Sequence, residues 1–181
     1  MGYRMNITEA CQYLDKQIPD KTTGLPDELF YFISRLTPLV NTDLLIRDKQ
    51  GRSLLAWRDD IYCGKGWHIP GSIVRFKESL EHRIIETAKK ELGTTDIVYN
   101  KIPLSIREII LSEHDNRAHF ISFLYECSLV KDFTIANDGK TERVPGFLAW
   151  HKSCPYNLIP VQEPYRKYID QKGFVGEKSY E

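Results

Sequence analysis

The segment 70–93, PGSIVRFKESLEHRIIETAKKELG, holds the residues whose types and spacing are best suited to chemistry. With the helical period of about 100° per residue, counted from Leu80, its apolar residues form one stripe. The stripe consists of Ile84, Ile85, Ala88 and Leu92. Glu91 falls on the edge of the stripe, away from the solvent-facing side. A carboxylate held against a core is costly unless it is paired or binds a cation.

Glu91 is therefore a candidate metal ligand. The alternative is a partly exposed glutamate near a helix C-terminus, where its charge is mildly unfavourable. Pro70 and Gly71 lie upstream, and a glycine lets the backbone approach a ligand closely. Magnesium commonly takes one or two protein carboxylates and completes its shell with waters and phosphate oxygens. One glutamate is thus sufficient in principle to hold Mg²⁺ against a diphosphate.

The same segment resembles the Nudix box, in which a glycine, five residues, a glutamate and seven residues precede Arg-Glu-aliphatic-x-Glu-Glu-x-Gly. The matching positions are Glu78, Ala88, Glu91 and Gly93. The departures are Ser72 for the box glycine, Glu86 for the arginine, and Thr87 and Lys90 for two glutamates. Outside the box, TPLVNTDLLIRDKQGRSLLAWR and KGWHIPGS make the chain similar to the GDP-mannose mannosyl hydrolase branch, over about residues 28–93.

This resemblance implies a Mg²⁺-dependent hydrolase of a nucleoside diphosphate sugar, GDP-mannose or another GDP-hexose, which releases nucleoside diphosphate and free sugar. It also implies a homodimer. The ligands of one Mg²⁺ carry over as Glu91 and the backbone carbonyl of Gly71. The nucleotide contacts carry over as Asp43 and Arg58. The alternatives are a solvent-facing Asp43 and a surface ion pair of Arg58 with a neighbouring aspartate in WRDD, which would be worth little.

The general base of that branch is a histidine on the loop before the last strand, where this chain has Val144-Pro145. A shift of the loop would bring Glu142 into reach instead. His119 is a further candidate, as are His68 and His114, because the ordinary pKa of histidine suits this work. Each histidine is otherwise an ordinary strand or turn residue.

Two aromatic residues, Trp67 and Phe120, are candidates for stacking on a base or lining a sugar pocket. The alternative for both is a place in the apolar core.

The remaining chain alternates helical and strand-like patterns. Helices are predicted over 6–18, with Thr8 as N-cap, over 27–36, over 79–92 with Gly93 closing the helix, and over 161–171. Strands are predicted over 39–47 and 52–58 as a hairpin around DKQG, over 66–71, over 97–111 and 119–130 as two long strands, and over 146–151.

This order favours an α+β fold, an α/β/α sandwich with a mixed sheet between helices and an extra N-terminal helix. We expect a helical extension over 1–26, a Nudix hydrolase domain over 27–172 and a flexible tail over 173–181.

The composition excludes several classes of function. The 181 residues contain 25 Lys+Arg and 25 Asp+Glu, so no net field attracts nucleic acid or an anionic membrane. No apolar run reaches the roughly 18 residues that span a bilayer, and the N-terminus lacks a signal-peptide core. We therefore expect a cytoplasmic protein without nucleic-acid or membrane partners. Its four scattered cysteines are expected to be reduced thiols.

Two alternatives to the sugar hydrolase remain. The first is a catalytically impaired binding module for nucleotide sugars, favoured by Lys90 and Glu86 at box positions, since Lys90 could supply the positive charge of a metal. The second is a Nudix pyrophosphatase for another nucleoside diphosphate derivative. Metal dependence separates the enzyme from the lysine-based binder.

Overall fold

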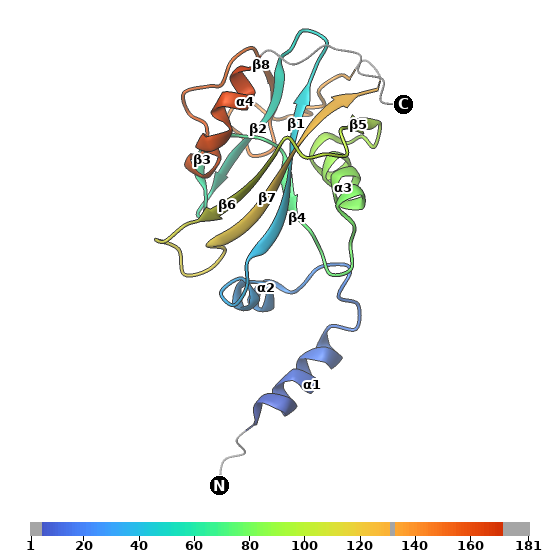
Figure 1. Cartoon of the computed structure of the whole chain (residues 1–181), viewed down its shortest axis with the longest axis vertical. Coiled ribbons are helices and arrows are strands. Elements are labelled where there is room, and N and C mark those ends of the chain that lie inside the picture. The colour runs from blue at the N-terminus through green and yellow to red at the C-terminus, as the bar shows by residue number, and fades with distance from the viewer. Residues whose placement is uncertain (1–4, 131–132, 172–181) are drawn as a thin grey trace.

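The computed structural model describes residues 5–130 and 133–171, and it shows a mixed β-sheet with helices on both faces (Figure 1). The strands are β1 (Leu39–Arg47), β2 (Ser53–Asp60), β3 (Gly64–His68), β4 (Gly71–Ile73), β5 (Ile97–Tyr99), β6 (Ser105–Ile110), β7 (His119–Leu129) and β8 (Leu148–His151). Their main order in the sheet is β3-β2-β1-β7-β5. The α+β class predicted from the sequence is confirmed.

The strand β1 is the centre of this sheet. It runs parallel to β7 over its whole length, from Leu39 beside Phe120 to Arg47 beside Ser128. All other strand pairs are antiparallel. The predicted hairpin turn is present, with Gly51 at a φ of 72°. Beyond this turn β1 and β2 pair only at Arg47 and Ser53, and the other end of β1 pairs with β4 instead. This divergence leaves room beside β1 for groups from other elements.

The helices are α1 (Ile7–Gln17), α2 (Asp27–Ile33), α3 (Leu80–Leu92), the 3₁₀ helix η1 (Pro160–Tyr165) and α4 (Arg166–Asp170). The helix α3 begins at its N-cap Ser79 and ends at Gly93, whose φ of 75° is the left-handed conformation that glycine adopts without strain. On one face of the sheet α3 packs through Ile84, Ala88 and Leu92. None of the described helices is long and apolar enough to cross a membrane.

The opposite face of the sheet is covered by the C-terminal segment. There Leu158, Tyr165 and Ile169 pack on a cluster that includes Leu45 and Leu124. The strands β1, β2 and β7 thus contribute alternate residues to two cores, as the period of two requires. The four cysteines are free thiols.

Several predicted boundaries were wrong. The run 97–111 forms two strands, β5 and β6, which pair with opposite ends of β7, and Pro103 lies in the break between them. Asn6, and not Thr8, caps α1, because its side chain accepts the N–H of Glu9. The helix predicted over 27–36 ends at Ile33.

The C-terminal prediction was also partly wrong, because the segment begins as the 3₁₀ helix η1, with Pro164 inside it, and only Arg166–Asp170 is α-helical. The predicted tail 173–181 lies outside the described residues. The helix α1 buries none of its residues and projects from the sheet in Figure 1, at the blue end of the chain.

Candidate active site

A cavity of about 250 Å³ opens at one end of β1, where β1 has left β2. Residues from β1, the β2–β3 turn, β4, α3, the β6–β7 turn and η1 line it. Of the residues predicted for the site, the cavity brings together Asp43, Arg58, Gly71, Glu91 and Phe120. Segments that are far apart in the sequence therefore line the same cavity.

Asp43 is buried, with 3% of its surface exposed. Its carboxylate accepts hydrogen bonds from the Ser122 hydroxyl at 2.5 Å, the Asn41 amide at 3.0 Å and the Gln162 amide at 3.4 Å. Burial raises the pKa of Asp43 to about 6, although the hydrogen bonds from Ser122 and Asn41 and the charge of Arg58 oppose the rise. Asp43 is therefore a buried acid whose charge is partly compensated, and it does not face solvent.

Gly71 lies directly against Asp43. A Cβ atom at this position would stand 2.3 Å from Asp43 Oδ1 and 2.9 Å from the carbonyl oxygen of Thr42. No side chain fits there, so this position requires glycine for the close approach of β4 to β1 and not for backbone freedom.

Glu91 lies in the last turn of α3, half-buried at the cavity. It accepts no hydrogen bond and forms no ion pair among the described residues. Burial raises its pKa, and the positive charges of Arg58, Lys90 and Lys140 oppose this effect. Glu91, which the sequence placed at the edge of the apolar stripe, is thus a desolvated carboxylate without a partner among the described residues.

Arg58 both lines the cavity and forms an ion pair. Its Nε lies 3.3 Å from Asp60 Oδ2, and its Nη1 lies 3.5 Å from the sulfur of Cys63. The ion pair between Arg58 and a neighbouring aspartate, which was the alternative interpretation of WRDD, is therefore present. Because the guanidinium has several donors in one plane, this pair leaves others for a ligand.

Sequence reasoning missed several residues of the cavity. Arg117 reaches it from the β6–β7 turn, and Gln162 reaches it from η1. The Gln162 amide also bonds to the backbone of Ile69, so it fixes the end of β3 next to Asp43. Neither residue belongs to a motif, and only the tertiary structure brings them to β1.

Among the histidines, His68 and His114 line the cavity. His68 is 5% exposed, and burial together with the charge of Arg58 lowers its pKa to about 3. His68 is therefore neutral near pH 7 and a weak base.

Three predicted site residues lie away from this lining. His119 is one residue before Phe120 on β7, so it points to the other face of the sheet, where its Nε2 lies 3.1 Å from Glu108 Oε1. Trp67 lies in the core, edge-on to Trp57 at 5.4 Å. Glu142 is exposed on the loop before β8. The structure therefore does not bring these three residues into the cavity with Asp43 and Glu91, and a role for them at a ligand stays a prediction.

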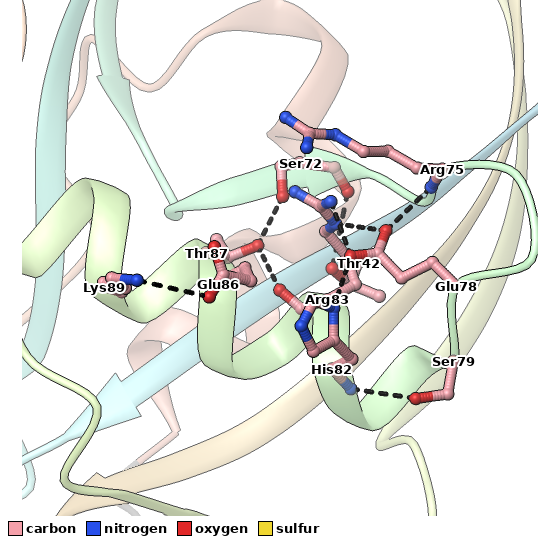
Figure 2. Close-up of polar contacts among 10 residues, drawn as sticks. All are labelled: Thr42, Ser72, Arg75, Glu78, Ser79, His82, Arg83, Glu86, Thr87 and Lys89. Atoms are coloured by element: carbon pink, nitrogen blue, oxygen red, sulfur yellow. Dashed lines mark hydrogen bonds and ion pairs between the residues drawn. The ribbon is translucent and has the colours of Figure 1, made fainter. Parts of the chain in front are cut away.

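A second group of polar residues lies at the N-terminal half of α3, and we call it the closed polar cluster: Ser72, Glu78, Arg83 and Thr87 (Figure 2). Both carboxylate oxygens of Glu78 accept from Arg83, at 2.6 and 2.7 Å. The Ser72 and Thr87 hydroxyls bond to each other, and Thr87 also donates to the carbonyl oxygen of Arg83. Two departures from the Nudix box, Ser72 and Thr87, thus tie α3 to β4 by hydroxyl contact.

The residues present fit one divalent cation better than several. The described residues contain no group of three or more histidine, cysteine or acidic side chains that could hold a metal. Glu91 alone offers an unpartnered carboxylate at the cavity, with Gly71 as a neighbouring source of backbone oxygen. A cation of the magnesium type accepts such a set when ligand phosphates and waters complete its shell.

No family model matches the sequence. Over 86 residues the chain is 31% identical to the low-salt glycan biosynthesis protein Agl8 of Haloferax volcanii, a match that covers 48% of this chain and 54% of that protein. The chain thus spans about half the length of the curated relative that it matches.

Solved structures show the fold. A MutT NUDIX hydrolase from Burkholderia pseudomallei superimposes with a TM-score of 0.55 at 18% identity, covering 75% of this chain and 98% of that one. A UDP-X diphosphatase superimposes with a TM-score of 0.52 at 14% identity, covering 92% and 82%. The chain therefore has the Nudix hydrolase fold. The similarity to the GDP-mannose mannosyl hydrolase branch stays a prediction.

Proposed function

We propose that this protein is a Mg²⁺-dependent hydrolase of a nucleoside diphosphate derivative, with a nucleoside diphosphate sugar such as GDP-mannose as the preferred substrate. The observation that carries the proposal is the unpartnered carboxylate of Glu91, which lines one cavity together with the cations Arg58, Lys90 and Arg117. Acidic and basic groups left uncompensated in a cavity are suited to a metal–diphosphate ligand.

In this proposal Glu91 and the Gly71 carbonyl hold the cation, and Arg58 binds the diphosphate. The cation would offset the charge that develops on the leaving diphosphate. Asp43, held by Ser122, Asn41 and Gln162, is oriented to accept hydrogen bonds from the nucleoside or sugar. Phe120 presents an apolar face to the same ligand.

The fold of the solved relatives supports hydrolysis of nucleotide derivatives as the class of reaction. The sequence resemblance supports the sugar substrate and attack at the sugar carbon, which releases nucleoside diphosphate. Its expectations of a homodimer and of a cytoplasmic location stay predictions.

One observation favours a second candidate, a binding module without turnover. Lys90 lines the cavity next to Glu91, at a position where the Nudix box has a glutamate. A lysine there supplies positive charge without a metal. In the closed polar cluster, two further departures from the box, Ser72 and Thr87, bond to each other.

The test is to incubate the purified protein with GDP-mannose, GDP-glucose, UDP-glucose and ADP-ribose, with Mg²⁺ or with EDTA, and to resolve the products by ion exchange. Glu91→Gln is the test variant. Glu86→Gln is its matched control, because Glu86 is a glutamate of the same helix whose side chain lies 3.6 Å from Lys89.

We expect GDP and free hexose, formed only with Mg²⁺ and by the wild type and Glu86→Gln. Nucleoside monophosphate as product would keep the hydrolase and move the attack to phosphorus. No turnover, together with a thermal shift by GDP-mannose that persists in EDTA and is lost in Lys90→Gln, would overturn the enzyme in favour of the binding module.

A further inference from the structure

The turn between β6 and β7 carries an arginine in an unusual backbone conformation. Arg117 has a φ of 49°, the left-handed region that residues other than glycine seldom adopt. Its backbone N–H donates to the hydroxyl of Ser34, at 3.0 Å, and Ser34 is the buried C-cap of α2. The conformation is therefore maintained by a contact with a helix more than 80 residues earlier in the chain.

The side chain of Arg117 is held by aromatic rings. Its guanidinium carbon lies 4.6 Å from the ring centre of Tyr62 and 5.9 Å from that of Phe30. Tyr62 belongs to the β2–β3 turn, and Phe30 belongs to α2. A cation over an aromatic ring is attracted to its face, and such packing also restricts the rotamers of the arginine.

Among the residues that the structure describes, none accepts a hydrogen bond from this guanidinium. Arg117 Nε is buried and has no hydrogen-bond partner, and Arg117 forms no ion pair with a described carboxylate. Arg117 is nevertheless one of the residues that line the cavity, together with Arg58 and Lys90. A buried donor without a partner costs free energy, so a ligand that accepts from it gains affinity.

Asp60 connects the two arginines electrostatically. Its Oδ1 accepts from the backbone N–H groups of Tyr62 and Cys63, and its Oδ2 pairs with Arg58. Burial would raise the pKa of Asp60, but these N–H groups and then the charges of Arg58 and Arg117 hold it below the usual value. One carboxylate thus faces two guanidinium groups, and the cavity keeps positive charge to offer to an anion.

We propose that Arg117 binds a phosphate oxygen of the nucleoside diphosphate ligand, as a second phosphate-binding arginine beside Arg58, and that α2 positions it through Ser34 and Phe30. The inference deepens the proposed function by assigning α2 and the β6–β7 turn to the ligand site. It concerns binding alone and holds whether or not the ligand is hydrolysed.

The probes are inorganic pyrophosphate, GDP and guanosine, titrated calorimetrically in EDTA so that metal does not contribute. The variants are Arg117→Gln, which removes the charge, and Arg117→Lys, which keeps the charge but loses the planar donors. Arg35→Gln is the matched control, because Arg35 also stacks on a ring, Phe32, at 5.6 Å, but is exposed and does not line the cavity.

We expect Arg117→Gln to weaken the binding of pyrophosphate and GDP by roughly 10- to 100-fold. Arg117→Lys should weaken it less, and Arg35→Gln should bind as the wild type does. Guanosine, which lacks phosphate, should bind equally to all four proteins. Melting temperatures near that of the wild type show that the variants are folded, and Arg117→Lys keeps the test valid if Arg117→Gln does not fold.

The positioning role of α2 has its own measurement. Ser34→Ala should weaken pyrophosphate binding by roughly 3- to 10-fold, and it should add nothing when Arg117→Gln is already present. If Ser34 acts on the structure alone, Ser34→Ala should weaken pyrophosphate binding by the same factor whether or not Arg117→Gln is present. This result would remove α2 from the proposal.

Wild-type affinity for pyrophosphate and GDP in Arg117→Gln would overturn the inference while leaving the proposed hydrolysis untouched. Absence of pyrophosphate and GDP binding by the wild type would overturn it as well. Binding that depends on Arg117 in a protein that hydrolyses none of the nucleotide sugars would support the inference and reject the proposed activity.

Discussion

Two carboxylates of the segment 70–93, Glu78 and Glu91, match the same family pattern but have opposite surroundings. The side chain of Glu78 is 7% exposed and accepts from Arg83, from His82 and from the backbone N–H of Arg75. Burial would raise the pKa of Glu78, but these hydrogen bonds hold it below its usual range. Glu91 has no such partner in the described part of the chain, and burial raises its pKa.

The difference separates a structural acid from an available one. A buried ion pair with complete hydrogen bonding fixes the entry into α3, and removing one partner leaves a buried charge. A desolvated carboxylate without partners keeps its affinity for a cation. Position in the motif does not distinguish the two residues, whereas their contacts do.

Of the substitutions that test the difference between Glu78 and Glu91, Glu91→Gln should cause the largest change, a loss of catalytic activity. Under the proposed function it removes the carboxylate that holds the cation, so kcat/KM should fall by roughly 100- to 1,000-fold. The fold should keep its stability, because a desolvated charge is removed. Steady-state kinetics with GDP-mannose and a thermal melt check both halves. Wild-type kinetics in the variant would assign Glu91 to the structure alone.

Glu78→Gln should have the converse effect. It leaves Arg83, whose side chain is 6% exposed, without its charged partner, so the free energy of unfolding should fall by about 3 kcal/mol. Urea denaturation measures this change. Glu81→Gln is the matched control, because Glu81 is 61% exposed and lies 3.7 Å from Lys101, and its change should stay within about 0.5 kcal/mol.

Thr87→Val tests the neutral part of the closed polar cluster. Thr87 is fully buried, and its hydroxyl bonds to Ser72 and to the Arg83 carbonyl. The isosteric change should lower the free energy of unfolding by about 1 kcal/mol. The double variant with Ser72→Ala should cost less than the sum of the two single changes, and full additivity would show that the hydroxyl pair contributes nothing.

The pH dependence of stability should differ in sign between the two acids. The folded-state pKa of Glu78 lies below 4.5, so its stabilisation is present above that value and is lost as pH falls through the folded pKa. The folded-state pKa of Glu91 lies above 4.5, so its contribution is most favourable below that value and is lost as pH rises.

Urea unfolding at several values between about pH 3 and pH 7 checks this contrast. The free energy of unfolding of the wild type minus that of Glu78→Gln should rise with pH. The corresponding difference between the wild type and Glu91→Gln should fall with pH. Parallel slopes for the two variants would contradict the opposite environments of the two carboxylates.

Features that depend on local spacing were predicted well. The strand β1 has the predicted bounds, and α3 begins and ends within one residue of its prediction, because a cap, an apolar stripe and Gly93 are all local signals. The helical period also predicted the position of Glu91 at the edge of the apolar stripe. Successive residues of a strand point to opposite faces of the sheet, so the sequence already implies that His119 and Phe120 do not point to the same face.

The sequence by itself therefore determined elements such as β1 and α3, the buried face of α3, and the position of Glu91 at the edge of that face. Only the tertiary structure decided which distant residues meet that carboxylate. The parallel pairing of β1 with β7 and the return of η1 bring Ser122 and Gln162 to Asp43, and the contact with Ser34 directs Arg117 toward the cavity. These contacts join residues some 80 to 120 positions apart, and no local periodicity encodes the closure of such loops.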